Sequence, residues 1–294
     1  MRLGEIGRQG TVLCPLYQKK ETGDGYVSPF SERGDREPSP VSLRSVMSWI
    51  VKRIQEDDYG CEERSEDSKV IVLVTLVDEN GQERVIRVED DWLYAHGIDE
   101  GDKWPTIVRI RSGGQSGVDR AALDFARKQN IEICGWCPKG GWAEDYTEAP
   151  GILAVYPELQ ETPEAEPWQR TLWNMRDAQA ILTIMPEGAG ESKGTELGVR
   201  EGAELGKPMF TARGVEDAAE IAAWLRALAE DGANGVTGAN GANWSFCANG
   251  ANGFGAVSGA VGIELCVGGP RASECPEAYR VTMEILEKVM EFTE

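Results

Sequence analysis

The chain has 294 residues, and its 30 basic and 50 acidic residues give a net charge of −20. This charge argues against a duplex nucleic acid partner, which needs a basic face, but leaves room for a small phosphorylated ligand. The sequence contains no apolar run long enough to span a membrane, and we expect no signal peptide, because the first ten residues lack an apolar stretch. Seven scattered cysteines suit a reducing compartment, so we expect a cytoplasmic protein. The single histidine, His96, argues against a histidine-based triad or zinc site.

The first hundred residues predict a small appendage of unknown role. Residues 1–40 are polar and rich in Gly, Pro and Ser, which indicates a flexible lead-in. Residues 41–104 predict an α+β unit, with an amphipathic helix over 41–54, a hairpin over 69–88 and a short helix over 92–95. An acidic connector separates the first helix from the hairpin, and His96 lies at the end of the short helix, before Gly97.

Residues 105–294 predict an α/β domain of the Rossmann-like, doubly wound type with a mostly parallel sheet. The sequence TIVRIRSGGQSGVDRAALDFAR reads as a strand, a glycine-rich turn and a helix. Residues 230–261 repeat Ala-Asn and Gly and predict a low-complexity loop, or alternatively a lid. We expect further strands over 131–135, 178–185, 209–211 and 262–267, and helices over 163–177, 196–205, 215–228 and 276–292.

Three glycine-containing loops follow strands, at 112–117, 186–195 and 268–271. Ligands of open parallel sheets bind outside the carboxyl ends of the strands, so these loops can converge on one site. Backbone N–H groups and helix N-termini there would bind an anion, most often a phosphate. The candidate cationic partners near these strand ends are Arg120, Lys139, Arg170, Arg176 and Arg271.

Two other kinds of chemistry remain open from the residues alone. Cys134 and Cys137 have the spacing of a dithiol redox site, although they run from a strand into a loop and also fit two ordinary thiols. The carboxylates of Asp119, Glu144, Asp145, Asp177 and Glu196 include potential general bases, which the sequence does not pair.

Five ordered motifs resemble the molybdenum-carrier protein family: SGGQSGVDRAALDFA, GWCPKGGWAED, YPELQET, QRTLWNMRDAQAIL and GPRASECPEAY. This family is similar to the Rossmann-like nucleotide-ligand proteins that include cytokinin-activating phosphoribohydrolases and the DNA-processing protein DprA. The resemblance covers residues 106–228 and 262–292. It implies a homodimer or homotetramer that binds either the molybdenum cofactor, which is a pterin phosphate that carries molybdenum, or a related nucleotide-like anion.

The resemblance also implies that a pterin would stack on Trp136 or Trp142. The ligand-binding residues that it implies are Gly113, Gly114, Gln115, Ser116, Gly117, Asp119, Arg120, Lys139, Gly140, Arg170, Thr171, Asn174, Arg176, Gly194, Thr195, Gly269, Pro270 and Arg271.

The chain departs from its relatives in the loop GAGESKGTELG, where Glu191 would repel an anion. The phosphoribohydrolases have a glutamate three residues after their Gly-Thr pair, whereas Gly198 holds that position here. We therefore favour a non-catalytic carrier. The alternatives are a phosphoribohydrolase-like enzyme with Glu196 or Asp119 as its base, and a sensor of a nucleotide-derived signal.

Overall fold

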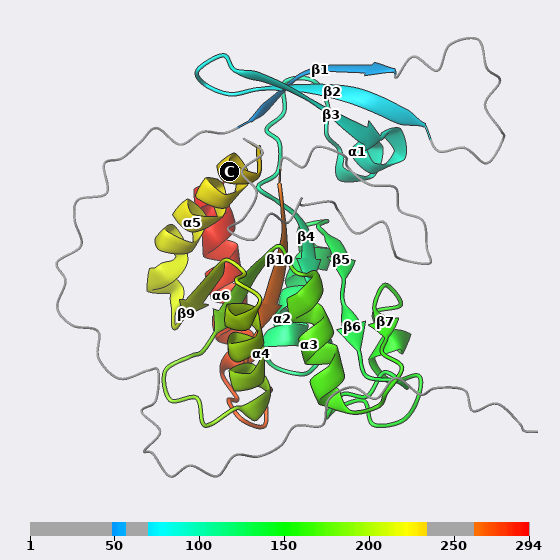
Figure 1. Cartoon of the computed structure of the whole chain (residues 1–294), viewed down its shortest axis with the longest axis vertical. Coiled ribbons are helices and arrows are strands. Elements are labelled where there is room, and N and C mark those ends of the chain that lie inside the picture. The colour runs from blue at the N-terminus through cyan, green and yellow to red at the C-terminus, as the bar shows by residue number, and fades with distance from the viewer. Residues whose placement is uncertain (1–48, 57–69, 234–261, 294) are drawn as a thin grey trace, which may run out of the picture. The chain divides into compact units, whose positions relative to one another are not determined.

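The computed structural model describes residues 49–56, 70–233 and 262–293 (Figure 1). The expected lead-in, the acidic connector and most of the Ala-Asn-Gly segment lie outside these residues.

The described N-terminal part is a three-stranded antiparallel sheet with one short helix. Strands β1 (Ile50–Glu56), β2 (Ile71–Val77) and β3 (Glu83–Glu89) pair in that order, and α1 (Asp90–His96) comes next along the chain. Alternating residues of β2 are buried, as expected for a sheet with one apolar face. Gly97 ends α1 in the left-handed conformation, with φ of 63°. The expected hairpin and short helix are confirmed.

The predicted helix over 41–54 is wrong where the structure describes it, because residues 50–54 belong to strand β1. The pairing of β1 with β2 shifts register between Val51 and Arg53. Such an irregularity interrupts the period-2 alternation that marks a strand. The β-branched residues Ile50, Val51 and Ile54 nevertheless favour an extended backbone once β2 supplies a partner. Residues 41–48 lie outside the described part of the chain.

The second part is a five-stranded, wholly parallel sheet in the order β5-β4-β10-β8-β9, which confirms the α/β prediction. Its strands are β4 (Ile107–Arg111), β5 (Glu132–Cys134), β8 (Ala180–Ile184), β9 (Met209–Ala212) and β10 (Ile263–Gly268). Two shorter strands, β6 (Trp136–Cys137) and β7 (Gln160–Glu161), pair separately and were not expected from the sequence.

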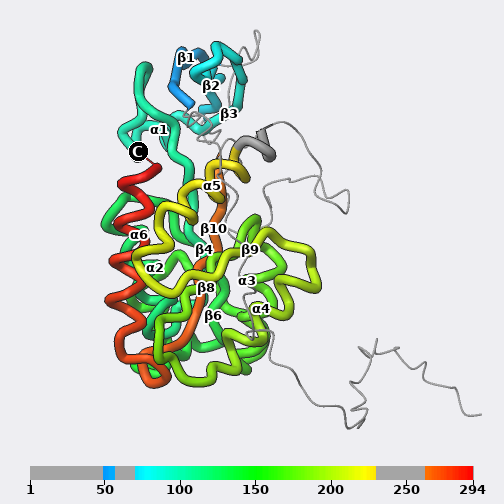
Figure 2. The backbone as a smooth tube through the Cα atoms, turned by 90° about the vertical axis from the view of Figure 1, so that its left-hand side faces the viewer, coloured from blue at the N-terminus to red at the C-terminus, as the bar shows by residue number. Residues whose placement is uncertain are grey.

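Helices cover both faces of the sheet, so the fold is doubly wound (Figure 2). Helices α2 (Val118–Lys128), α5 (Ala218–Ala233) and α6 (Ala278–Thr293) pack on one face. On the other face, α3 (Pro167–Asp177) packs beside α4 (Lys193–Glu204). The main core lies under the first group, where Ile110, Leu182 and Leu265 are fully buried.

The last strand of the chain lies at the centre of the sheet. β10 pairs in parallel with β4 on one side and with β8 on the other. It carries a buried acid, Glu264, whose Oε1 accepts a hydrogen bond from Arg111 Nε at 2.6 Å, while Oε2 accepts one from Arg109 Nη1 at 3.2 Å. Both arginines come from β4, so these bonds link the two strands by side chains as well as by the backbone.

Glu264→Gln is expected to lower the free energy of unfolding by about 3 kcal/mol, because it leaves Arg111 buried with a weaker partner. Urea denaturation of the full chain measures this loss. Glu284→Gln, which removes an exposed partner of Arg280 on α6, is the matched control and should cost less than about 1 kcal/mol. Equal losses in the two variants would contradict the role given to Glu264.

Candidate functional site

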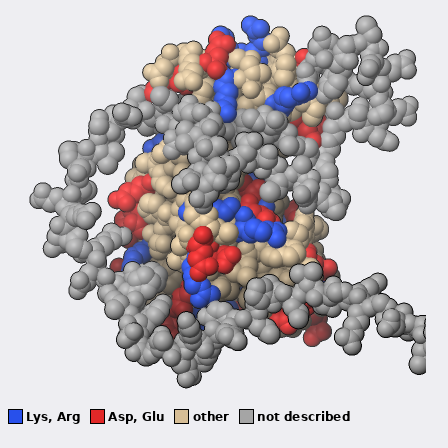
Figure 3. Space-filling view, viewed as in Figure 1, with Lys and Arg blue, Asp and Glu red and all other residues tan. Residues whose placement is uncertain are grey.

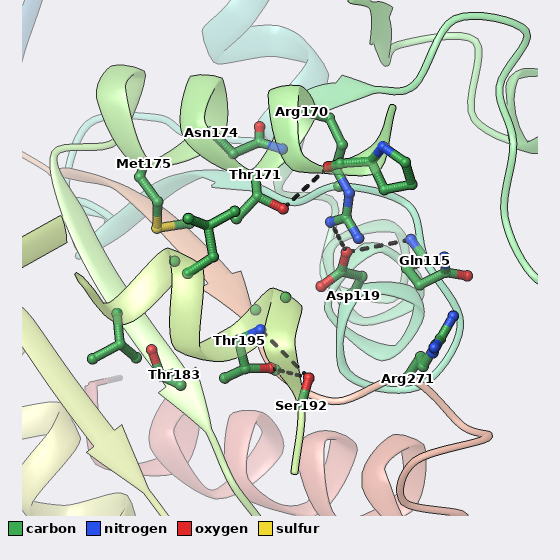
Figure 4. A pocket seen from close by; sticks show the side chains of 18 of the residues that line it. Gln115, Asp119, Arg170, Thr171, Asn174, Met175, Thr183, Ser192, Thr195 and Arg271 are labelled. Carbon is green, nitrogen blue, oxygen red and sulfur yellow. Dashed lines mark hydrogen bonds and ion pairs between the residues drawn. The ribbon is translucent and has the colours of Figure 1, made fainter. Parts of the chain in front are cut away.

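A cavity of about 730 Å³ lies between α3, α4 and the carboxyl ends of β4, β8 and β10 (Figure 4). All three predicted glycine-containing loops reach it, as expected for an open parallel sheet. The predicted residues that line it are Gly113, Gln115, Asp119, Arg170, Thr171, Asn174, Gly194, Thr195, Gly269 and Arg271.

The first loop is held by a buried ion pair between α2 and α3. Arg170 Nη1 donates to Asp119 Oδ2 at 2.7 Å, and the backbone N–H of Gln115 donates to the same oxygen at 3.3 Å. The guanidinium lies so close to Gly113 that a Cβ there would be 1.9 Å from Nη1. Burial raises the pKa of Asp119, although Arg170 opposes this shift. Much of the positive charge of Arg170 is therefore balanced before any ligand binds.

The second loop ends in the N-terminus of α4. The helix begins at Lys193 rather than at the expected Glu196, so Gly194 and Thr195 lie in its first turn. Ser192 caps it, since its Oγ accepts a hydrogen bond from the Thr195 N–H at 3.4 Å. In the described part of the chain, the N–H groups of Lys193 and Gly194 have no hydrogen-bond partner and the Lys193 ammonium has no ion-pair partner. Open donors at a helix N-terminus favour an anion.

The third loop approaches the first through glycines. A Cβ on Gly117, whose φ is +74°, would lie 2.5 Å from the carbonyl oxygen of Pro270. The N–H of Val118 donates to that oxygen at 3.3 Å. On the other side, a Cβ on Gly269 would lie 2.3 Å from the carbonyl oxygen of Ile184. Glycine is required at both positions because the backbones are in contact.

Glu144 joins the first loop to the residues that follow the third loop. Ser116 Oγ donates to its Oε1, and the N–H and Oγ of Ser273 donate to its two oxygens at 3.1 and 2.5 Å. Partial burial tends to raise the pKa of Glu144, but these bonds and nearby Arg271 outweigh burial and hold the pKa below its usual value. A carboxylate used in this way positions loops and is a poor candidate for a general base.

Several predicted cations lie outside the cavity, and two of them are paired with acids. Arg120 contacts Asp145 at 2.9 Å, and Arg176 contacts Asp177 at 2.5 Å. Lys139 is exposed on its loop and does not line the cavity. On the face drawn in Figure 3, basic and acidic side chains lie interspersed. The remaining predicted residues outside the lining are Gly114, Ser116, Gly117, Gly140 and Pro270, and the alternative base Glu196 is exposed on α4.

Other residues line the cavity without having been expected from the sequence. Lys193 was missed because the expected helix started three residues too late. Trp168 comes directly after Pro167 at the start of α3, and nothing in the sequence places it at a ligand site. Of the two tryptophans expected to stack on a pterin, Trp142 lines the cavity, while Trp136 lies outside it and donates from Nε1 to Asp177 Oδ2 at 2.7 Å. The other unexpected lining residues include Met175, Thr183 and Cys266.

The cysteine pair lacks the electrostatics of a redox site. Burial raises the pKa of Cys137 to about 11 and the pKa of Cys134 above its usual value, so both are thiols near neutral pH. All four described cysteines are free. Within the described residues, no group of three or more His, Cys, Asp and Glu side chains is arranged to hold a metal ion.

Gly117→Ala should lower the free energy of unfolding by about 3 kcal/mol, because a methyl group would combine a left-handed backbone with a clash against Pro270. Gly140→Ala is the matched control, since Gly140 has a similar φ of +82° and no heavy atom within 4 Å of an added Cβ. It should cost only about 1 kcal/mol in the same urea titration. A smaller loss for Gly117→Ala than for its control would disprove the close approach of the loops.

Replacing both Cys134 and Cys137 with Ser should leave the affinity for a bound ligand within about twofold, because neither thiol lines the cavity. Iodoacetamide should modify both thiols slowly at pH 7 in the wild-type chain and faster above pH 9, as protonated thiols require. Rapid modification at pH 7 would mean that a stabilised thiolate is present after all.

Comparisons with known proteins show which family the chain belongs to. The model of the circularly permuted YpsA SLOG family matches residues 110–243. A crystal structure described as a "putative molybdenum carrier protein" from Syntrophus aciditrophicus SB is 31% identical, with 63% of this chain and 96% of that chain covered and a TM-score of 0.47. No curated protein matches the chain. No helix within the described ranges has the length and hydrophobicity to cross a membrane. The match over nearly all of a relative confirms the resemblance, and the chain belongs to the molybdenum-carrier proteins of the circularly permuted YpsA SLOG family.

Proposed function

We propose that this chain carries or sequesters a phosphorylated small molecule, with the molybdenum cofactor as the favoured ligand and a nucleotide as the alternative. The observation that supports this most is the open N-terminus of α4 at the mouth of the cavity. There the N–H groups of Lys193 and Gly194 lack partners in the described chain, and the Lys193 ammonium adds a charge. These are the groups that a phosphate needs.

The cavity fits a ligand of this kind. Its volume of about 730 Å³ lies within the range usual for small-molecule sites. Trp142 and Trp168 line it and offer aromatic surface for a pterin or a purine ring. Molybdenum would be cargo, held by the dithiolene of the pterin, so the protein need not supply a metal ligand. The thiol of Cys266 lines the cavity, but burial raises its pKa to about 12, so it is protonated at neutral pH.

The hydrolase alternative has less support from the site. A general base must reach the reacting group or its water. Glu196 is exposed on α4 and does not line the cavity, while Asp119 is bound to Arg170 and to the backbone of Gln115. The sensor alternative shares the binding site with the carrier and differs only in the response that binding triggers.

Two neighbouring residues of opposite charge, Lys193 and Glu191, allow a test of the anion site. The measurement is the affinity of the full chain for pyrophosphate, by calorimetry. Lys193→Gln should weaken binding about fivefold, and Glu191→Gln should strengthen it by a similar factor, since both side chains are exposed at the cavity mouth. Both effects should shrink as salt is added.

Lys288→Gln on α6 removes the same charge as Lys193→Gln but lies in an exposed ion pair with Glu291. It should leave pyrophosphate affinity unchanged. If Lys193→Gln behaves like this control, or if both mouth variants change affinity in the same direction, the α4 N-terminus is not the phosphate site.

A further inference from the structure

One carboxylate oxygen in the cavity is left without a partner by the described residues. Asp119 accepts its two hydrogen bonds, from Arg170 and from the backbone of Gln115, on Oδ2. The side chain is only 5% exposed, yet it lines the cavity. Figure 4 shows the other oxygen, Oδ1, turned away from Arg170 toward the space between α3 and α4. Asp119 therefore presents an unused hydrogen-bond acceptor to whatever fills this space.

The surroundings of Oδ1 leave room for a ligand group. Gly268 lies beside it, and a Cβ on that glycine would be 3.8 Å from Oδ1. Gly268 pairs in register with Thr183 of β8. The Thr183 side chain is buried at 4% exposure and lines the cavity, and its hydroxyl has no hydrogen-bond partner among the residues that the structure describes. Asp119 on α2 and Thr183 on β8 thus line the same cavity.

The chemistry of these groups selects the complementary atoms. Both oxygens are open to the cavity, so a ligand that fills it displaces water from them and loses free energy unless it supplies N–H or O–H groups in return. A phosphate would not offset this loss, because two anions repel at short range. Arg170 and Arg271 also line the cavity but are paired with acids, which leaves Lys193 at the start of α4 as the lining cation without an acidic partner among the described residues. Different parts of the lining therefore favour the phosphate and the organic part of a ligand.

Building on the proposed function, we propose that Asp119 Oδ1 and the Thr183 hydroxyl bind N–H or O–H donors on the uncharged part of the phosphorylated ligand. The cavity then selects phosphate esters whose organic part carries such donors, and inorganic phosphates bind only its mouth. In this assignment, Arg170 holds Asp119 in place and offsets its charge, and it does not itself grip the phosphate.

Calorimetry of the full chain with two probes, pyrophosphate and guanosine 5′-monophosphate, separates these roles. The wild-type chain should bind guanosine monophosphate more tightly than pyrophosphate. Asp119→Asn should weaken guanosine monophosphate about tenfold or more, the effect of losing a charged hydrogen bond. The same variant should bind pyrophosphate equally or more tightly, because Arg170 loses its acidic partner.

Two further variants keep the test sound if Asp119→Asn folds poorly. Thr183→Val removes only a hydroxyl and should weaken guanosine monophosphate a few-fold, with pyrophosphate unchanged. Asp124→Asn makes the same substitution on the same helix outside the cavity, where Asp124 accepts from Tyr156 and Tyr279, and should change neither affinity. Thermal unfolding of each variant shows whether it is folded at the temperature of the titration.

Two analogues of guanosine monophosphate identify the N–H or O–H group of the ligand that Asp119 Oδ1 binds. Purine riboside 5′-monophosphate lacks donors on its base, and 2′,3′-dideoxyguanosine 5′-monophosphate lacks the ribose hydroxyls. The analogue that binds weakly to the wild-type chain and no longer responds to Asp119→Asn lacks the recognised donor.

Equal losses of both probes in Asp119→Asn, or unchanged guanosine monophosphate binding in both cavity variants, would overturn the inference. So would wild-type guanosine monophosphate binding no tighter than pyrophosphate binding. In each of these outcomes the wild-type chain still binds pyrophosphate, so the proposed function stands. A wild-type chain that binds neither probe would instead overturn the proposed function.

Discussion

The site depends on the central position of β10. This strand comes last in the sheet along the chain but lies between β4 and β8, where backbone pairing and the bonds from Arg109 and Arg111 to Glu264 hold it. Its end delivers Gly268 and Gly269 to the gap between the first two glycine-containing loops. Because the cavity is bounded by the ends of all three strands, it is complete only when the C-terminal strand has joined the sheet. Binding a ligand would therefore stabilise the assembled sheet.

The pairing of charges near the strand ends also explains how a strongly acidic chain can attract an anion. Its arginines there are mostly balanced by neighbouring acids, as in Arg170 with Asp119 and Arg271 with Glu274. Paired cations contribute less to anion binding than free ones, so the backbone N–H groups of α4 and Lys193 carry more of it in our account. Selection of the ligand then rests on groups deeper in the cavity, which matches the free acceptor on Asp119.

Much of the fold can be predicted from sequence patterns, and the site in part. Alternating apolar strands and amphipathic helices predicted the α/β domain, and the glycines at 113, 117 and 269 predicted where loops meet. The order of the strands could not be predicted in this way, because periodicity does not say which strands pair. The helix expected over residues 41–54 failed because a register shift at Val51 and Arg53 hid the strand pattern. Arginine positions alone did not reveal their acidic partners, so the sequence could not distinguish Arg170, inside the cavity, from Arg120, outside it. The sequence did not point to Lys193, because α4 begins there and not at the expected Glu196, and local signals locate helix boundaries poorly.

The central claim is that the cavity holds a phosphorylated organic ligand. The most direct measurement is mass spectrometry and metal analysis of the full chain purified without oxygen from a host that makes the molybdenum cofactor. Our account predicts a phosphorylated pterin released on denaturation, with molybdenum in a near-stoichiometric amount, and less of both from the Lys193→Gln variant. A nucleotide without metal would replace the favoured ligand by the alternative. Protein that carries no phosphorylated molecule, and takes up none when molybdopterin or nucleotides are added, would contradict the account.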